Sequence, residues 1–411
     1  MSKRLCRHCH NPLTNVFLDL GFAPPSNAYL QSDDLSRPER HFPLKLYVCE
    51  RCWLVQTEDY AQCDELFTAD YAYFSSTSQS WLAHAADYFA MISRRLGLTE
   101  HSYVIELAAN DGYLLKNAVK AGIPCLGIEP TAQTAATAEK LGIPVIKEFF
   151  GRTLAERLAR DGKMADLLIG NNVYAHVPDI NDFTEGMRII LKPQGTITLE
   201  FPHLLNLIQG RLFDTVYHEH YSYLSATFVE RIFQEAGLRL YDLEEIPTHG
   251  GSLRIYGCHA DAEFATTPAV AKFLKKERDN GLCDIAGYAG FQDEVNRIKD
   301  DFLRYLLAKK ASGISVMGYG AAAKGNTLLN YAGVKPDLLP CVFDAAPSKQ
   351  GKFLPGSHIP ILPPDKIREF RPQELVIFPW NIATELVAQL AYIREWGGKV
   401  FTVVPEVKQI L

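Results

Sequence analysis

The stretch VIELAANDG at residues 104–112 decides the fold of this chain. Its first four residues have the apolar character of a short buried strand, and a turn of small and polar residues follows at once. Such a turn lets the backbone approach a ligand closely, and the N–H groups of a helix expected over residues 112–121 would point at that ligand. The stretch therefore predicts the first strand, turn and helix of an α/β sheet with a ligand at its edge.

Apolar strands alternate with helical segments between residues 103 and 259. After the first strand, others are expected at residues 125–128, 145–146, 167–169 and 197–199. This alternation predicts a parallel sheet with helices on both faces. Two later segments, residues 238–243 and 253–257, are separated by Pro247 and the turn HGG at residues 249–251. They predict an antiparallel hairpin added to the sheet edge.

Glu129 ends the second strand, seventeen residues after Gly112. A carboxylate at this point can accept hydrogen bonds from both hydroxyls of a ribose, so an adenosine-containing ligand is implied. The dinucleotide fingerprint Gly-x-Gly-x-x-Gly is absent, and Ala108 stands where its first glycine would be expected. A ligand without a pyrophosphate is therefore favoured.

The N-terminal segment is rich in loops and proline, and its apolar stretches are short. A core this thin needs a further constraint. Two Cys-x-x-Cys pairs, Cys6 with Cys9 and Cys49 with Cys52, provide a four-sulfur site suited to zinc, and a closed site of this kind is structural rather than catalytic. His8 and His10 are less favoured substitute ligands. The five other cysteines, which are scattered, are expected to be small buried side chains: Cys63, Cys125, Cys258, Cys283 and Cys341.

The C-terminal part begins with charged helical sequence over residues 261–311, which we interpret as solvated connecting helices. A second strand, turn and helix then starts at Ile314 and contains the turn GYGAAAKGN at residues 318–326. Further strands are expected at residues 339–343, 375–378 and 400–404. This pattern predicts a second, smaller α/β domain of the nucleotide-binding type.

The segment FDTVYHEHYSY at residues 213–223 ends in an uninterrupted run of seven polar or titratable side chains, which packing alone does not require. A metal site is one interpretation, although the helical spacing His-Glu-x-x-His is missing. Acid-base chemistry is favoured, in which a histidine takes a proton from a carbon beside a ketone while a tyrosine and a carboxylate orient it. His176, in the segment NNVYAHVP at residues 171–178, is a second candidate, or else a core histidine that donates to a carbonyl.

These motifs resemble known proteins at two levels, first in the turn alone and then over the whole chain. The turn at residues 106–112 resembles that of class I methyltransferases, except for Ala108 in place of the usual glycine. The four cysteines, this turn, and the segments at residues 217–223, 249–254 and 318–326 together resemble, over essentially the whole chain, the sugar C-methyltransferases of deoxysugar pathways. The resemblance implies S-adenosylmethionine as cofactor and methylation of carbon 3 of a 4-keto-6-deoxy sugar linked to a nucleoside diphosphate.

The resemblance also implies roles for individual residues. His220 would be the base, and Tyr71, His176, Tyr217 and Glu219 would complete the catalytic site. The C-terminal domain would hold the nucleotide, with Lys324 facing a phosphate or the base unless it is a solvated lysine at a helix start. The expected cofactor-binding residues are Glu106, Ala108, Asn110, Gly112, Glu129, Asn171 and Asn172. The expected substrate-binding residues are His249, Gly250, Gly251, Ser252, Arg254, Gly320, Lys324 and Asn326.

Composition sets the outer limits. The chain has 411 residues and a formal net charge of −6, which disfavours a nucleic-acid partner. No signal peptide or membrane-spanning run is visible, so a cytoplasmic protein is expected. We expect a zinc-binding domain over residues 1–75, a methyltransferase domain over 76–260, and linker helices with the second α/β domain over 261–411. The nucleotide, either dTDP or GDP, and the oligomeric state stay open.

Two alternative functions are kept. A nicotinamide-dependent sugar-nucleotide oxidoreductase would use the turn Gly318-x-Gly320-x-x-Ala323 and Asp344 to bind NAD. A non-catalytic zinc-knuckle binding protein is the other, but the acidic balance and the titratable run at residues 217–223 both disfavour it.

Overall fold

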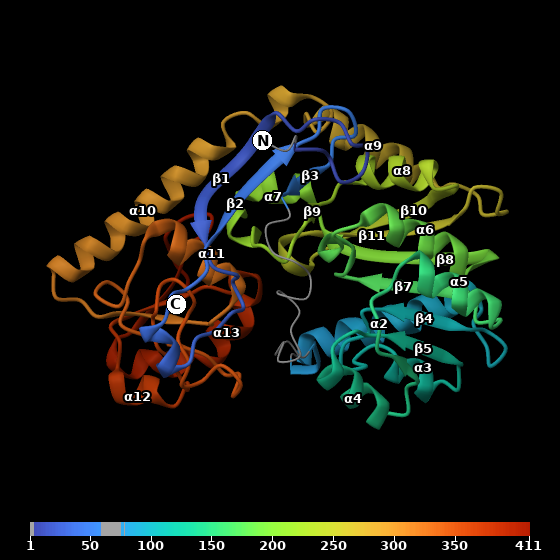
Figure 1. The fold of residues 1–411 in the computed structure, drawn as a ribbon. Coiled ribbons are helices and arrows are strands. Elements are labelled where there is room, and N and C mark those ends of the chain that lie inside the picture. Colours follow the sequence, from blue (N-terminus) through green and yellow to red (C-terminus); the bar gives the residue numbers. More distant parts are fainter. Residues whose placement is uncertain (1–3, 59–74, 78) are drawn as a thin grey trace.

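The computed structural model describes residues 4–58, 75–77 and 79–411, and it contains three β-sheets (Figure 1). The two α/β sheets lie in separate lobes, and the N-terminal strands run between them. The predicted α/β class with a terminal hairpin and a second, smaller sheet is confirmed.

The central sheet has seven strands in the order β10-β11-β8-β7-β4-β5-β6. Five of them are parallel, and the hairpin of β10 and β11 joins antiparallel to β8 at one edge. The parallel strands are β4 (Val104–Leu107), β5 (Cys125–Ile128), β6 (Val145–Ile146), β7 (Ala165–Asn171) and β8 (Leu191–Pro202). The hairpin strands are β10 (Leu238–Ile246) and β11 (Ser252–His259). The helices of this part are α2 (Gln79–Leu96), α3 (Lys116–Lys120), α4 (Ala132–Lys140), α5 (Arg152–Arg160), α6 (Ile180–Ile190), α7 (Leu204–Gly210) and α8 (Ala226–Glu235).

The helix expected over residues 112–121 is shorter than predicted. α3 begins only at Lys116: Gly112 has a φ of 78°, which a right-handed helix does not accommodate, and residues 113–115 form turns. The backbone N–H of Lys116 still reaches the carbonyl of Gly112. Residues 108–115 therefore form a longer connection at the end of β4 than the sequence indicated.

The N-terminal sheet is antiparallel, with the order β1-β2-β3-β9. Its strands are β1 (Asn15–Ala23), β2 (Phe42–Val48), β3 (Val55–Thr57) and β9 (Ser222–Tyr223). The last strand, β9, comes from the segment at residues 213–223, so the N-terminal segment does not complete this sheet by itself. The cysteine knuckles pack into the core beneath the central sheet, whereas β1 and β2 share a core with the C-terminal part. The thin N-terminal core is thus supported by both neighbours as well as by its cysteines.

The C-terminal sheet has the order β14-β13-β12-β15-β16-β17, parallel except for β17. Its strands are β12 (Val316–Tyr319), β13 (Val342–Phe343), β14 (Ile361–Leu362), β15 (Glu374–Ile377), β16 (Lys399–Thr402) and β17 (Lys408–Gln409). Its helices are α11 (Ala323–Ala332), α12 (Lys366–Phe370) and α13 (Ala383–Gln389). This is the second α/β unit that the turn at residues 318–326 predicted.

The connecting helices are α9 (Pro268–Asp279) and α10 (Phe291–Ala311). The prediction of a purely solvated stretch is wrong at Glu277, which is buried and accepts hydrogen bonds from His203 and from the backbone N–H groups of Ala226 and Thr227. Glu277 therefore caps the start of α8 from another helix. Neither α10 nor any other helix in the described part of the chain combines the length and apolar character needed to cross a membrane.

Candidate active site, cofactor turn and metal centre

The turn after β4 has an unusual backbone. Ala108, Asn110 and Gly112 have φ values of 54°, 50° and 78°. The left-handed region is open to glycine but costs an L-residue roughly 1–2 kcal/mol, so Ala108 is held there by its surroundings. This conformation explains why a glycine is expected at that position, and Ala108 adopts it without one.

Glu129 reaches back from the end of β5 to this turn. One carboxylate oxygen accepts the backbone N–H of Asn110 at 2.9 Å, and the other accepts that of Thr131 at 2.9 Å. The structure thus brings together the turn and the acidic residue that the sequence paired.

Three carboxylates, those of Glu106, Asp111 and Glu129, gather at the carboxyl end of the sheet, and all three are buried. Burial raises the pKa of Glu106 well above its usual range, and the charges of Glu129 and Asp111 raise it further. One oxygen of Glu106, one of Asp111 and the side-chain oxygen of Asn171 are buried without a partner among the described residues. A cationic ligand with hydrogen-bond donors satisfies these groups, and S-adenosylmethionine has both a sulfonium and an ammonium.

The acid-base candidates Tyr217 and His220, in the segment at residues 213–223, lie beside His176. The Nδ1 of His220 lies 3.0 Å from the carbonyl oxygen of Thr215. A carbonyl only accepts, so Nδ1 carries the hydrogen and Nε2 of the neutral ring is the basic nitrogen. The ring of Tyr217 lies 4.0 Å from that of His220 between centroids, and the ring of His176 lies 4.6 Å from it. Tyr71, the remaining catalytic candidate, lies outside the described residues.

Burial keeps these imidazoles neutral. It lowers the pKa of His176 to about 4, and it lowers the pKa of His220 well below 6.5, with repulsion from His176 as the next cause. His176 donates through Nδ1 to the carbonyl oxygen of Glu219 at 2.8 Å. The hydrogen bond proposed for a core histidine is therefore present, yet it places His176 beside the candidate base.

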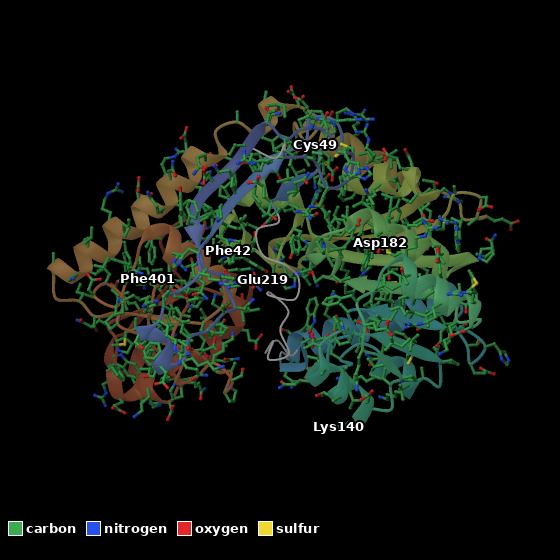
Figure 2. All side chains as sticks on the ribbon, in the orientation of Figure 1. Phe42, Cys49, Lys140, Asp182, Glu219 and Phe401 are labelled. Carbon is green, nitrogen blue, oxygen red and sulfur yellow. The ribbon has the colours of Figure 1, made fainter. Side chains whose placement is uncertain are left out.

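Glu219 lies between the two lobes (Figure 2). Its Oε1 accepts a hydrogen bond from Nδ2 of Asn27 at 3.0 Å, and its Oε2 is buried without a partner in the described part of the chain. Burial raises the pKa of this carboxyl. Asn27 is a site residue that the sequence did not reveal, because 192 positions separate it from Glu219 and it belongs to no motif.

The segment at residues 249–254 serves the packing of the two lobes. A Cβ on Gly250 would lie 2.6 Å from the ring of Trp380, and one on Gly251 would lie 2.4 Å from the amide of Asn206. The Oγ of Ser252 donates to the carbonyl oxygen of Thr248 at 3.0 Å. Burial lowers the pKa of His249 to about 4.

Arg254 is held by two carboxylates. Its Nε donates to Glu200 at 2.8 Å, and its Nη1 donates to Glu244 at 2.9 Å. The other oxygen of Glu200 lies 2.9 Å from Nε2 of His84. Contact of Arg254 and of the segment at residues 249–252 with a substrate stays a prediction.

In the C-terminal lobe, Gly320 has a φ of 90° and a Cβ there would lie 2.4 Å from Pro379. Lys324 does not extend freely into solvent. Its Nζ lies 4.2 Å from the centroid of the Trp380 ring and donates to Asn381 at 2.8 Å, and burial lowers its pKa to about 8. The side-chain amide of Asn326 donates to the carbonyl oxygen of Ser26 at 2.6 Å.

Asp344 repeats the arrangement of Glu129. Its two oxygens accept the backbone N–H groups of Ala321 and Ala346, both at 2.7 Å. The C-terminal turn is thus built like the turn after β4, with an acid at the end of the neighbouring strand.

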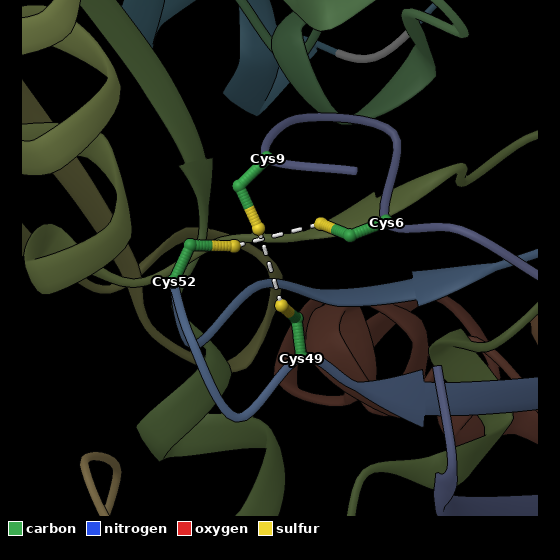
Figure 3. Close-up of side chains that lie close together, drawn as sticks. All are labelled: Cys6, Cys9, Cys49 and Cys52. Atoms are coloured by element: carbon green, nitrogen blue, oxygen red, sulfur yellow. Dashed lines mark hydrogen bonds between the residues drawn. The ribbon is translucent and has the colours of Figure 1, made fainter. Parts of the chain in front are cut away.

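The four cysteines Cys6, Cys9, Cys49 and Cys52 converge (Figure 3). Their sulfurs lie within 4.8 Å of one another, with 3.5 Å between Cys6 and Cys52 and between Cys9 and Cys49. Zinc–sulfur bonds of about 2.3 Å in a tetrahedron require sulfurs about 3.8 Å apart, so the set fits zinc. Within the described ranges no other group of three or more ligand side chains forms, and His8 turns its Nδ1 to Asn181 instead.

Arg7 connects this knuckle to the titratable segment. Its guanidinium donates to the carbonyl oxygens of Pro178 and Thr57, both at 2.8 Å, and it lies over the ring of Tyr221. Pro178 closely follows His176, and the backbone N–H of Thr57 donates to the carbonyl of Tyr221. The cysteine knuckle therefore supports the backbone just after each of the two histidines.

Three family models match the chain, and solved methyltransferases resemble part of it. Family models match residues 6–67 (“Putative zinc binding domain”), 79–243 (“Methyltransferase domain”) and 247–405 (“C-methyltransferase C-terminal domain”). The magnesium protoporphyrin IX methyltransferase of Synechocystis is 13% identical, with a TM-score of 0.36, and the alignment covers 44% of this chain and 84% of that one. An S-adenosylmethionine-dependent methyltransferase of Clostridium acetobutylicum is 10% identical, with a TM-score of 0.35, over 43% of this chain and 92% of that one.

The fold and the match to the methyltransferase family model define an S-adenosylmethionine-dependent methyltransferase of class I. The C-methyltransferase NovU of Streptomyces niveus is 32% identical over 406 residues, which are 98% of this chain and 96% of that protein. The chain belongs to the C-methyltransferase family. Membership of this family disfavours both alternatives, the nicotinamide-dependent oxidoreductase and the non-catalytic zinc-knuckle binding protein.

Proposed function

We propose that this C-methyltransferase transfers a methyl group to carbon 3 of a 4-keto-6-deoxy sugar linked to a nucleoside diphosphate, through a base-generated enolate, and that its four cysteines hold a structural zinc ion. The observation that carries the proposal is the tautomer of His220, whose hydrogen bond to Thr215 leaves Nε2 as a free base beside Tyr217. When bound, S-adenosylmethionine supplies the electrophilic methyl group that the enolate carbon takes.

His220 removes the proton from the carbon next to the ketone. The carbonyl of Thr215 stabilises the imidazolium that forms, because Nδ1–H already points at it. Tyr217 supplies a hydrogen bond to the developing enolate oxygen, which such a proton transfer requires. Glu219 and Asn27 fix the backbone carbonyl that orients His176.

Lys324 links the substrate to the pKa of His220. Burial is the main reason for the low pKa of His220, but the positive charge of Lys324 also lowers it. A diphosphate beside Lys324 offsets this one contribution, which is smaller than those of burial and of His176.

The C-terminal lobe holds the nucleotide at the turn of residues 318–326. Asp344 lies where a nucleotide-type domain places its ribose acceptor, and Lys324 supplies the cation for the diphosphate. The prediction for Lys324→Gln is a weaker affinity for dTDP or GDP, whichever binds, measured by calorimetry. Lys366→Gln, at an exposed lysine that pairs with Glu369, is the control.

Hydrogen exchange tests the reaction. Wild-type enzyme, a 4-keto sugar nucleotide and S-adenosylhomocysteine in deuterium oxide should exchange the proton on carbon 3 without methylation. His220→Asn should reduce both exchange and methyl transfer by a factor of about 100 to 10,000 while still binding S-adenosylhomocysteine. His101→Asn, at an exposed histidine, should leave both rates unchanged. Near wild-type exchange by His220→Asn would place the base elsewhere, with His176 tested next.

A further inference from the structure

The C-terminal lobe contacts the turn at residues 213–216, which holds the proposed base His220. α11 packs against the 3-10 turn of Phe213–Thr215, and the hydroxyl of Thr327 donates to the carbonyl oxygen of Val216 at 2.7 Å. Nε1 of Trp380 donates to Oδ2 of Asp214 at 2.6 Å. Both contacts cross between lobes, and they end on residues on either side of Thr215, whose carbonyl holds His220.

The pair of Trp380 and Asp214 is tightly built. Asp214 is 2% exposed, and its second oxygen is buried without a partner among the described residues. Trp380 contacts Lys324 through its ring face, and its edge lies where a side chain on Gly250 would clash. The Trp380 side chain therefore touches the proposed nucleotide turn and the base-holding turn at the same time.

We propose that Trp380 and Asp214 are positioning residues through which the C-terminal lobe fixes the tautomer and orientation of His220. The proposal rests on the assignment of His220 as the base. With Asp214 anchored, the neighbouring carbonyl of Thr215 stays aligned to Nδ1–H. Without the anchor that acceptor shifts, a hydrogen on Nε2 becomes competitive, and the ring in that state has no lone pair to present to the substrate.

This arrangement couples substrate binding to the base. A nucleotide that contacts Lys324 also affects Trp380, because Lys324 packs on its ring. The same indole donates a hydrogen bond to Asp214. The C-terminal lobe thus contributes to the proton-transfer step as well as to affinity, and the two contributions separate in kcat and KM.

Two substitutions remove the contacts with little change in shape. Trp380→Phe deletes the N–H donor but keeps a ring against Lys324 and Gly250, and Thr327→Val deletes the hydroxyl. Both should lower kcat by about tenfold or more while the affinity for S-adenosylhomocysteine and KM change less than about twofold, since misplaced catalytic groups slow the chemical step. Trp396→Phe is the matched control, because its Nε1 donates to Pro372 in the same lobe, away from the site.

Asp214 separates positioning from direct catalysis. Asp214→Asn keeps an oxygen that accepts from Trp380, so it should retain most of the activity, whereas Asp214→Leu should lose it to the extent of Trp380→Phe. An equal loss in Asp214→Asn and Asp214→Leu would overturn the positioning role, because it would show that the charge itself is used. A kcat for Trp380→Phe within about twofold of wild type, or a change in KM alone, would overturn it as well.

Nitrogen-15 NMR of histidine-labelled protein without substrate gives a readout that does not need the reaction. The signal of His220, assigned by its loss in His220→Asn, should report hydrogen on Nδ1 in wild type and in Trp396→Phe, and a mixture of tautomers in Trp380→Phe. An unchanged signal in Trp380→Phe would refute the coupling. If instead wild-type enzyme performs no exchange on the sugar nucleotide, the proposed reaction fails while the tautomer result still decides this inference.

Discussion

The imidazole of His176 meets that of His220 edge to face, with ring centroids 4.6 Å apart and an angle of 67° between the rings. Each ring gives its Nδ1 hydrogen to a backbone carbonyl, of Glu219 for His176 and of Thr215 for His220. After burial, the charge of His176 is the next cause that disfavours protonation of His220. Neutral His220 is the form able to accept a proton, so this relationship bears directly on the pH range of the enzyme.

The first prediction concerns that pH range. Protonated His220 is inactive as a base, so kcat/KM should fall as the pH falls through its pKa, which burial and His176 hold well below 6.5. His176→Asn removes the repulsion, the pKa of His220 rises, and the acid limb moves to higher pH. The limb should stay in place for His101→Asn. A pH-rate profile for His176→Asn that overlays that of wild type would show that the two rings are not coupled.

The second prediction concerns the cofactor turn. Glu129 accepts N–H groups from Asn110 and Thr131, so Glu129→Gln turns an amide NH₂ toward one of these donors and distorts the turn. The affinity for S-adenosylhomocysteine should fall by about tenfold to a hundredfold, equivalent to about 1.5–3 kcal/mol for hydrogen bonds to a charged group. Calorimetry measures it directly. Glu139→Gln, at an exposed glutamate on α4 that pairs with Lys147, is the control, and equal affinities in both variants would contradict the role of Glu129.

Local sequence was enough to predict the parts that depend on local chemistry. The strand and turn at residues 104–112, the hairpin around residues 249–251 and the paired cysteines each carry their signal within a few positions. The helix after Gly112 was misjudged because a positive φ is invisible in composition alone. Burial of Glu277 was missed because a charge in a charged stretch looks solvated until the helix that it caps is known.

The residues that link the parts could not be predicted from the sequence. Trp380 and Asp214 are 166 positions apart, and Arg7 and Pro178 are 171 apart. Neither pair belongs to a motif, and each forms only when separate elements pack together. Such contacts follow from the topology, which brings β9 of the titratable segment into the N-terminal sheet and places α11 against the turn before it.

The third prediction concerns the metal. The protein should contain one zinc per chain by elemental analysis, and Cys49→Ser should lose zinc and lower the melting temperature. Arg7→Met tests the link to the site, because Arg7 supports Pro178 and Tyr221 without being a ligand. It should keep its zinc and lower kcat. Full activity of Arg7→Met with zinc retained would show that the knuckle acts on stability alone, and a zinc-free wild-type protein would refute the metal site.

The last prediction uses the buried carboxyl of Asp214. Burial raises its pKa from 3.8 to about 6, against the opposing effects of Lys324 and the hydrogen bond from Trp380. Between these two values the folded protein binds a proton that the unfolded chain does not, so the contribution of Asp214 to stability falls as the pH rises. The shift of about 2 units corresponds to about 3 kcal/mol, and the loss is complete above about pH 6.

Asp214→Asn has no such proton, so its free energy of unfolding relative to that of wild type should rise from pH 4 to pH 7. Denaturant unfolding at several pH values measures the difference in the free energy of unfolding. Most of its rise should occur between pH 4 and pH 6, and little above pH 6. Asp279→Asn, at an exposed aspartate at the end of α9 that pairs with Lys275, controls for the loss of a carboxylate. A constant difference between wild type and Asp214→Asn over this range would mean that Asp214 is hydrated in solution, and the anchor for the Thr215 carbonyl would then have to come from Thr327 alone.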